Sequence, residues 1–290
     1  MVMRPLDLFL AFCVPVIWGL GFVFAKGAIA HFPPILLIAL RFTVTALVLI
    51  WFVKPPVALF KQIALIALVS ATIQYSMTFT ALQYLNASTA GIVVQLETPL
   101  LVLMGWALLG DKPSLRKIIG ILISFSGVIL MTGDAKLQAE WGWLLVFIGG
   151  LVIWSAGQIM VRRLGEVGGF TLIAWVSAFA APQLFLASWM LERDQVQLIM
   201  EADWTIWATV LYLGVIMTAL GYGLWYHLLG RYPVSLVSPF LLLIPVATLV
   251  GGVMILGETA SVEVLIGGAV IIAGVAFILV ERKRPLPPPP

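Results

Sequence analysis

Ten apolar runs, each close to 20 residues long, follow one another along this 290-residue chain with only short breaks between them. A helix rises about 1.5 Å per residue, so a run of this length crosses the roughly 30 Å hydrocarbon layer of a membrane. The runs are continuously apolar rather than alternating, which favours helices over barrel strands. We therefore predict an all-α integral membrane protein with ten transmembrane helices, at residues 7–25, 34–53, 62–82, 88–110, 116–132, 141–161, 170–191, 204–226, 234–256 and 262–280.

The scarcity of charge supports this fold class and excludes several functions. Only 10% of the residues are charged, whereas a soluble domain carries roughly a quarter. The basic residues are scattered, so the stripe expected of a nucleic-acid-binding surface is missing. Cys13 is the only cysteine, and His31 and His227 are the only histidines. We therefore expect no disulfide, no metal site and no bound cofactor.

The distribution of lysine and arginine predicts the orientation, because cytoplasmic loops carry an excess of these residues. If the N-terminus is cytoplasmic, twelve basic residues fall in cytoplasmic segments and three fall outside. The twelve are Arg4, Lys54, Lys61, Lys112, Arg116, Lys117, Arg162, Arg163, Arg231, Arg282, Lys283 and Arg284, and the three are Lys26, Lys136 and Arg193. This asymmetry predicts a multi-pass protein of a bacterial-type inner membrane with both termini in the cytoplasm.

The two halves of the chain, with five runs each, resemble one another. Trp18 precedes Lys26 by the same spacing at which Trp154 precedes Arg162. A second match is an acid followed by two glycines at equal spacing: Asp111, Gly120 and Gly127, then Glu258, Gly267 and Gly274. Because five is odd, the second half is predicted to be inverted in the membrane, as in many secondary transporters. The glycines are seven residues apart, hence on one helix face, and are predicted to let helices pack closely.

We accordingly predict a first five-helix repeat at residues 1–136, a second at 137–284 and a disordered proline-rich tail at 285–290.

Short motifs resemble a known family. These are the Trp18-Gly19 pair, the segment Phe32-Pro33-Pro34-Ile35-Leu36-Leu37-Ile38-Ala39-Leu40-Arg41-Phe42 and the pair Gly257-Glu258. With the paired halves, they resemble the EamA family of the drug/metabolite transporter superfamily over nearly the whole chain. The segments 221–225 and 229–232 are similar to bacterial exporters of O-acetylserine and cysteine. The resemblance implies two inverted five-helix repeats around a central cavity, and export of amino acids or related metabolites.

Polar and aromatic side chains in the middle of the runs are the candidate site, because polar groups in a membrane are costly and face the protein interior or mark function. The predicted substrate-cavity residues are Trp18, Gln74, Tyr75, Thr78, Phe79, Gln95, Glu97, Trp154, Gln158 and Tyr222. Hydrogen bonding between helices is the alternative role for the glutamines. Trp225 and Tyr226 lie nearer the end of their run, where aromatic residues usually mark the membrane interface.

Arg41 and Glu97 are the two charges predicted deep in the membrane. Counted from the starts of their runs, they lie at depths of roughly 10 and 14 Å. Such charges need a partner or water, so a direct or water-bridged pair is predicted. In the functional version Glu97 alternates between Arg41, a proton and the substrate's ammonium group, which would couple transport to protons. In the structural version the pair pins two helices, or Arg41 extends alone to the interface.

These features favour a secondary transporter that exports an amino-acid-like metabolite by alternating access, with a small-molecule substrate, the lipid bilayer and protons as its partners. The P-loop pattern of ATP-driven proteins is absent. A polyspecific drug or cation exporter is the closest alternative. A membrane-embedded enzyme would need a compact catalytic set, which the sequence lacks, and a scaffold would need neither a polar interior nor a repeat. The oligomeric state is left open, and a monomer suffices for this fold.

Overall fold

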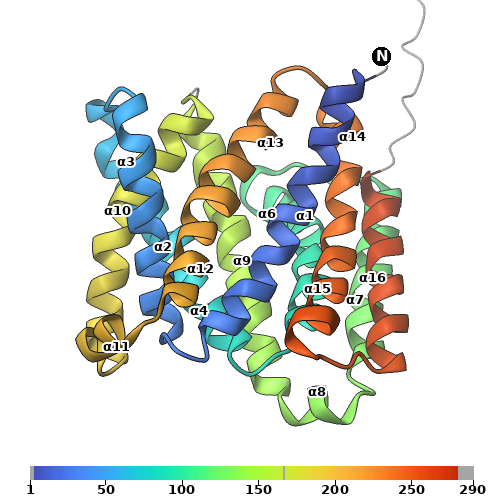
Figure 1. Cartoon of the computed structure of the whole chain (residues 1–290). Coiled ribbons are helices and arrows are strands. Elements are labelled where there is room, and N and C mark those ends of the chain that lie inside the picture. The colour runs from blue at the N-terminus through green and yellow to red at the C-terminus, as the bar shows by residue number, and fades with distance from the viewer. Residues whose placement is uncertain (1–2, 166, 280–290) are drawn as a thin grey trace, which may run out of the picture.

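The computed structural model describes residues 3–165 and 167–279, and all regular elements in these ranges are helical. Figure 1 shows the long helices side by side in one bundle. The elements are α1 Pro5–Ala28, α2 Pro34–Leu49, α3 Phe60–Ala67, α4 Gln74–Leu82, α5 Ala87–Val93, α6 Glu97–Leu109, α7 Leu115–Met131, α8 Ala135–Ala139, α9 Trp141–Leu164, α10 Gly169–Leu191, α11 Gln195–Glu201, α12 Trp204–Leu211, α13 Gly221–Leu229, α14 Val234–Val237, α15 Ile244–Leu256 and α16 Val262–Leu279. The short 3₁₀ helices η1 Ile50–Phe52 and η2 Val57–Leu59 flank the connection between α2 and α3.

Within the described residues, nine segments are long and apolar enough to cross a membrane. They correspond to nine of the ten predicted runs. The remaining run, the fifth along the chain, forms α7, which has 17 residues and lies against α16 (Figure 1). The membrane-spanning, all-helical prediction is therefore confirmed, and a tenth crossing by α7 remains a prediction. The short helices α8 and α11 lie at the end of the bundle away from the N-terminus.

Four of the spans change helical geometry part of the way across. We number the spans in the order of the ten predicted runs. The third span contains a π-helical segment, η3 Leu68–Ile73, between α3 and α4, and the eighth span contains another, η5 Tyr212–Leu220, between α12 and α13. The fourth contains a 3₁₀ turn, η4 Val94–Leu96, between α5 and α6, and the ninth contains η6 Ser238–Leu243 between α14 and α15. Departures of both kinds change the direction of side chains and occur at functional sites.

Helix pairing follows a pattern that an inverted repeat would produce. Helix α2 packs on α10 and α7 packs on α16, so each helix contacts its own counterpart in the other half. Helix α1 packs on α15, and its counterpart α9 packs on α6. Helices α6 and α15, which are followed by Asp111 and Glu258, also end alike. Gly110 and Gly257 adopt left-handed conformations with φ values of 76° and 66°, which glycine tolerates without a steric penalty.

The glycines of α7 and α16 have the packing role predicted for them. A Cβ atom on Gly127 would lie 2.6 Å from the carbonyl oxygen of Gly267, and one on Gly274 would lie 2.7 Å from that of Gly120. These contacts are with backbone, which cannot swing aside. Apolar surface gains little by leaving lipid, so close backbone approach supplies much of the attraction between these helices.

Replacing Gly127 with leucine should therefore force α7 and α16 apart. We expect the free energy of unfolding to fall by about 3 kcal/mol or more, the upper end of the usual range for overpacking, because backbone atoms block the new side chain. The measurement is thermal unfolding of purified protein in detergent. Gly142→Leu is the matched control, since open space surrounds Gly142. Equal unfolding temperatures for the two variants would contradict this account of the helix pair.

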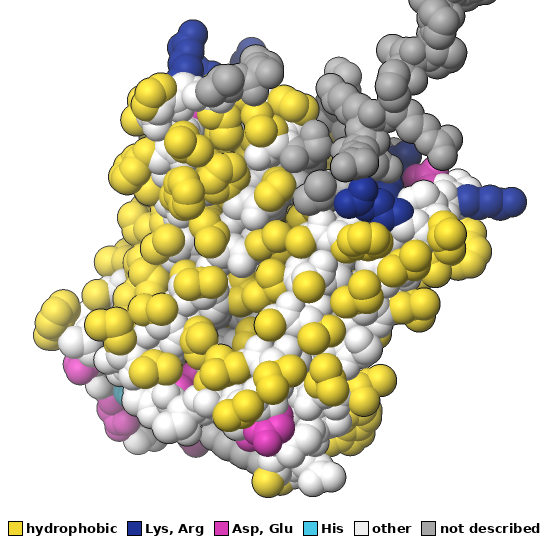
Figure 2. All heavy atoms as spheres, turned by 90° about the vertical axis from the view of Figure 1, so that its right-hand side faces the viewer, with side chains coloured by type: hydrophobic (Ala, Val, Ile, Leu, Met, Phe, Trp, Pro, Cys, Tyr) yellow, Lys and Arg dark blue, Asp and Glu magenta, His cyan; other side chains and the backbone are white. Residues whose placement is uncertain are grey.

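The outer surface has the charge distribution of a membrane-spanning protein. We call the end of the bundle at which α1 begins the N-terminal face, and the other end the opposite face. Figure 2 shows hydrophobic side chains over the middle of the molecule, lysine and arginine gathered at the N-terminal face, and most of the visible acidic residues at the opposite face. Large apolar side chains such as Trp51 and Met254 are 80% exposed on this surface, as lipid contact requires.

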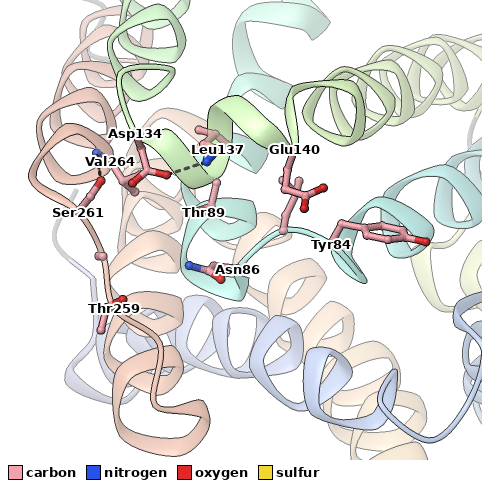
Figure 3. A pocket seen from close by; sticks show the side chains of 11 residues that line it. Tyr84, Asn86, Thr89, Asp134, Leu137, Glu140, Thr259, Ser261 and Val264 are labelled. Atoms are coloured by element: carbon pink, nitrogen blue, oxygen red, sulfur yellow. Dashed lines mark hydrogen bonds between the residues drawn. The ribbon is translucent and has the colours of Figure 1, made fainter.

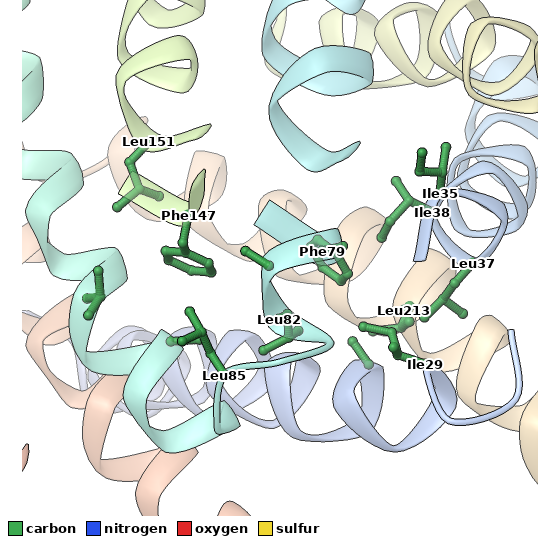
Figure 4. Packing of buried hydrophobic residues seen from close by; sticks show 14 of the residues in the cluster. Ile29, Ile35, Leu37, Ile38, Phe79, Leu82, Leu85, Phe147, Leu151 and Leu213 are labelled. Atoms are coloured by element: carbon green, nitrogen blue, oxygen red, sulfur yellow. The ribbon is translucent and has the colours of Figure 1, made fainter. Parts of the chain in front are cut away.

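The interior core lies between α2 and the helices around it. Leu37 and Ile38 of α2 are fully buried, and Figure 4 shows them near Phe79 of α4 and Leu213 of η5. This packing fixes α2 against the third and eighth spans. It thereby determines where Arg41, one turn further along α2, reaches the middle of the protein.

Candidate functional site

The broken segments of the fourth and ninth spans are joined by a predicted site residue. Gln95 lies in η4, is 6% exposed, and donates through Nε2 to the carbonyl oxygen of Leu241 in η6 at 3.1 Å. The hydrogen bond links the two halves of the chain at the level where both helices change to 3₁₀ geometry.

Arg41 is the most deeply placed charge, with a residue exposure of 1%. Its Nε donates to Thr218 Oγ1 of η5 at 2.9 Å, and its guanidinium carbon lies 4.9 Å from the centre of the Tyr75 ring and 5.4 Å from that of Phe42. Its buried Nη1 has no hydrogen-bond partner among the described residues. Cation–π contacts lower the cost of burying the charge but leave this N–H group unsatisfied.

Glu97 and Arg41 do not form an ion pair within 4 Å in the described part of the chain. The ring of Tyr222 of α13 lies 5.0 Å from that of Trp18 and 6.2 Å from that of Tyr226. Glu97 and Tyr222 are both half-buried. The pairing of Arg41 with Glu97 stays a prediction, in its water-bridged form.

The four predicted residues of the third span lie together on α4. Gln74 Nε2 donates to Thr78 Oγ1 at 3.2 Å, and Thr78 in turn donates to the Gln74 carbonyl oxygen at 3.1 Å. The Tyr75 ring lies 5.5 Å from that of Phe79, which stacks on Phe22 of α1 at 6.5 Å. The buried Oε1 of Gln74 has no partner among the described residues. This leaves a hydrogen-bond acceptor available near the middle of the protein.

The two matched tryptophans have different surroundings. Trp18 donates through Nε1 to the Met217 carbonyl oxygen in η5 at 3.1 Å, and its ring lies 5.0 Å from Tyr222 and 5.9 Å from Trp225. Trp225, which the sequence suggested for the membrane interface, is therefore half-buried in an aromatic cluster. Trp154 and Gln158 of α9 are half-buried, and within the described ranges neither makes a side-chain hydrogen bond or ring contact. Their place in the cavity remains a prediction.

We expect Gln74→Ala to weaken substrate binding more than Gln158→Ala does. Gln74 is 4% exposed and offers an unpaired acceptor, whereas Gln158 is half-buried without a hydrogen bond. One lost hydrogen bond corresponds to about a 3- to 10-fold rise in KM. Transport assays at equal expression measure this rise in KM. Gln83→Ala, at an exposed position at the end of the same span, is the control. If both Gln74 and Gln158 variants transport normally, these side chains hold helices together or face lipid.

On the opposite face, two carboxylates cap helices that belong to the other half. Glu258 accepts hydrogen bonds from Ala87 N at 2.6 Å, Ser88 N at 3.0 Å and Ser88 Oγ at 2.7 Å, at the start of α5. Glu192 accepts from the backbone N–H groups of Ile35 and Leu36 at the start of α2. Burial raises the pKa of the Glu192 carboxyl above its ordinary value, and these hydrogen bonds act against that rise. Negative charge at a helix N-terminus also interacts favourably with the helix dipole.

The N-terminal face carries a cluster that the sequence did not reveal. Asp7 in the first turn of α1 is 2% exposed and accepts from Tyr232 Oη at 2.7 Å and from His227 Nε2 at 3.3 Å. Arg231 lies 3.6 Å from the same carboxylate. An acid at the end of an apolar run normally stays in water, so only the tertiary structure shows that Asp7 joins α1 to the end of α13.

A pocket of about 190 Å³ opens at the opposite face. Figure 3 shows Tyr84, Asn86 and Thr89 on one side of it, Asp134 and Glu140 above, and Thr259 and Ser261 from the loop after α15. Asp134 Oδ1 accepts from the backbone N–H of Leu137, which fixes the entry into α8. The pocket is thus lined by both halves and by two acids, beside the Glu258 cap.

A bundle of apolar spans, four of which change helical geometry near buried polar side chains, is typical of a class: helical membrane transport proteins. The family model described as the EamA-like transporter family matches residues 6–133 and 141–280, so this chain belongs to the EamA-like transporter family. It is a multi-pass membrane transporter with a small-molecule substrate, not an enzyme. The resemblance seen in the sequence is confirmed.

Relatives cover almost the whole chain. A protein of Salmonella typhimurium named "Probable amino-acid metabolite efflux pump" is 30% identical over 92% of this chain and 93% of its own length. A protein of the same name from Escherichia coli K12 is 27% identical over 91% and 92%. A solved structure that is 21% identical covers 95% of this chain and 96% of its own, with a TM-score of 0.64. That last likeness concerns the fold alone.

Proposed function

We propose that this protein is a secondary transporter that exports amino acids or related small metabolites by alternating access, driven by a proton gradient or by exchange. The observation that carries the proposal is the central site. Arg41 is buried beside Tyr75 and Thr218 of the third and eighth spans, and Glu97 begins α6 directly after η4, where the helical geometry of the fourth span changes. The names of the two efflux-pump relatives support an amino-acid-like substrate.

The physical argument rests on what a zwitterion needs inside a membrane. Its two charges must be met by opposite charges or dipoles, because a lone charge in hydrocarbon is costly. Its carbon skeleton must be met by apolar contact, which the aromatic rings of Trp18, Tyr75 and Tyr222 supply. The π-helical and 3₁₀ segments change the direction of side chains and of backbone groups in the interior of the bundle, where such a ligand would lie.

The test is metabolite efflux from cells that express the protein, compared with cells that carry an empty vector. O-acetylserine and cysteine are the first compounds to measure, because segments 221–225 and 229–232 resemble exporters of these metabolites. The proposal expects accumulation of at least one amino-acid-like compound outside expressing cells. An unchanged extracellular metabolite profile at verified expression would reject it.

The proposed orientation has ten crossings, with the N-terminal face in the cytoplasm of a bacterial-type inner membrane. The expected result is that reporter fusions active only in the periplasm are silent at both termini. A fusion after Glu140, in the connection before α9, should be active. An active periplasmic reporter at the C-terminus would mean that α7 does not cross and that the spans number nine.

A further inference from the structure

We infer that the unsatisfied guanidinium of Arg41 is the binding site for a substrate carboxylate, which restricts the substrates to carboxylate-bearing small molecules. The inference deepens the proposed function and rests on it. Arginine stays charged under all conditions in a protein, and it binds carboxylates through two parallel N–H groups. Here Nε is used by Thr218, while the buried Nη1 has no partner in the described structure.

Arg41 is enclosed by protein and lacks a charged partner among the described residues. No carboxylate of the described residues lies within 4 Å of Arg41, and Glu97, the acid in mid-span, is held apart from it. A charge buried without a partner costs several kcal/mol, so such a group is retained where a ligand supplies the missing charge. The rings of Tyr75 and Phe42 on the guanidinium orient it and exclude lipid.

The position of Glu97 adds the second half of the recognition. Glu97 is half-buried at the start of α6, and no ion pair within 4 Å joins it to Arg41 in the described structure, so we assign it to the ligand's ammonium group. A ligand with a carboxylate on Arg41 and an ammonium group toward Glu97 would join the two charges that the protein keeps apart. An α-amino acid has this pair of charges, whereas the amine that remains after decarboxylation has only one.

The experiment compares a carboxylated probe with its decarboxylated counterpart in proteoliposomes: L-cysteine against cysteamine. We expect the wild type to prefer cysteine by about 10- to 100-fold in kcat/KM, the usual value of a charge-assisted contact. Arg41→Gln should abolish that preference, chiefly through KM. Arg41→Lys, which keeps the charge but not the fork, should retain part of it. Thr45→Val is the control for packing, because Thr45 is buried on the same helix and bonds only backbone oxygens.

The outcomes separate the two levels of the proposal. A wild type that moves no amino acid rejects the proposed function itself. A wild type that moves cysteine, with an unchanged preference in Arg41→Gln and Arg41→Lys, overturns the carboxylate site alone. Should Arg41→Gln fail to fold, Arg41→Lys decides: a cysteine-to-cysteamine ratio equal to that of the wild type counts against the inference.

A second inference comes from an independent asymmetry between the two faces. On the opposite face, Lys26 Nζ donates to the carbonyl oxygens of Leu82 and Gln83 at 2.9 and 2.7 Å, at the end of α4. Glu258 accepts from the backbone N–H groups at the start of α5. A base and an acid thus hold the two ends of one helix–helix connection. We call this arrangement the clamp.

On the N-terminal face the counterpart residues make a different contact. Arg162 matches Lys26 by its spacing from the paired tryptophans, and Asp111 matches Glu258 at the end of its helix. Arg162 Nη1 lies 2.6 Å from Asp111 Oδ2, and both side chains are more than half exposed. The base and the acid here bind each other, and the matching connection, between α13 and α14, is not held by this pair.

We propose that the clamp exists on both faces and closes on one at a time. In a transporter built from inverted repeats, the two halves exchange their conformations during the transport cycle. Unequal contacts at equivalent positions therefore correspond to two conformational states of the same protein. In the state seen here Lys26 and Glu258 close the opposite face. In the other state Asp111 and Arg162 separate and hold the connection between α13 and α14, while Lys26 and Glu258 release theirs.

The test measures distances between spin labels in full-length protein that carries Cys13→Ser, which removes the only native cysteine. One label pair at positions 83 and 259 reports on the opposite face, and one at 112 and 230 reports on the N-terminal face. Glu258→Gln removes one charged cap, so we expect the first distance to lengthen and the second to shorten. The ratio of the two populations should change by about tenfold. Asp111→Asn should not produce this shift.

Glu201→Gln, an acid-to-amide change at an exposed position of the same face, is the control and should leave both distances unchanged. If Glu258→Gln does not fold, Lys26→Gln is measured instead, with the same expected shift. Distances that stay the same on both faces in a folded Glu258 or Lys26 variant would overturn the clamp. So would a lengthening on the opposite face without a shortening on the N-terminal face.

Discussion

Replacing Glu97 with glutamine is expected to abolish the response of transport to a pH gradient, while substrate exchange persists with a higher KM because the amide oxygen still accepts from an ammonium group. Among the described residues, Glu97 is the one acid placed in the middle of a span, and it is half-buried there. Glutamine keeps the shape and the hydrogen-bonding oxygen but cannot bind or release a proton. A carrier that exchanges one proton per substrate gains about a tenfold accumulation ratio per pH unit. The variant should lose this gain.

The measurement is uptake into everted vesicles or proteoliposomes, with and without an imposed pH difference. Counterflow of labelled against unlabelled substrate at equal pH checks that the variant still folds, binds and moves substrate. Glu263→Gln, an exposed acid in the first turn of α16, is the matched control and should respond to the gradient as the wild type does. A Glu97→Gln protein that retains gradient-driven transport would show that another group carries the proton, or that transport is an exchange.

Truncating Trp18 to alanine is expected to damage both stability and transport, whereas the matched change Trp154→Ala should do so far less. Trp18 loses its hydrogen bond to Met217 and its contacts with Tyr222 and Trp225. Removal of a large aromatic side chain from a core costs about 3–5 kcal/mol, and the partial exposure of Trp18 places it near the lower value.

Thermal unfolding in detergent and efflux at equal expression are the two measurements. Trp18→Phe separates the ring from the hydrogen bond, and it should keep more transport than the alanine variant. Equal losses in Trp18→Ala and Trp154→Ala would instead support the symmetric cavity predicted from the sequence, with both tryptophans facing the substrate.

The close pairing of α7 and α16 shows how far sequence patterns reach. Gly120 and Gly127 fall on one helix face because seven residues make two turns, and the same holds for Gly267 and Gly274. The sequence therefore predicted that each glycine face packs closely on a neighbouring helix, and the structure shows that the two faces pack on each other, backbone against backbone. Such a prediction succeeds because it depends only on local geometry and on the absence of large side chains.

The central site shows where such patterns end. Uniformly apolar runs carry no periodic signal that could mark a π-helical or 3₁₀ segment, so the breaks at η3, η4, η5 and η6 were not foreseen. Arg41 and Glu97 were placed at similar depth, but depth along a helix does not fix the direction in which a side chain points. No ion pair within 4 Å joins them among the described residues, which depends on how the helices that carry them rotate against one another.

The sequence by itself determined that this chain spans a membrane many times, where most of the helices begin and end, and which family it belongs to. It could do so because lipid admits few structures, and because proline, glycine and charge act locally at helix ends. Only the tertiary structure decided that Asp7 is buried against Tyr232, that Trp18 and Trp154 differ, and that Glu258 caps a helix while Asp111 pairs with Arg162. These outcomes depend on contacts between segments more than 50 residues apart, and no local pattern encodes which of two equivalent contacts is made.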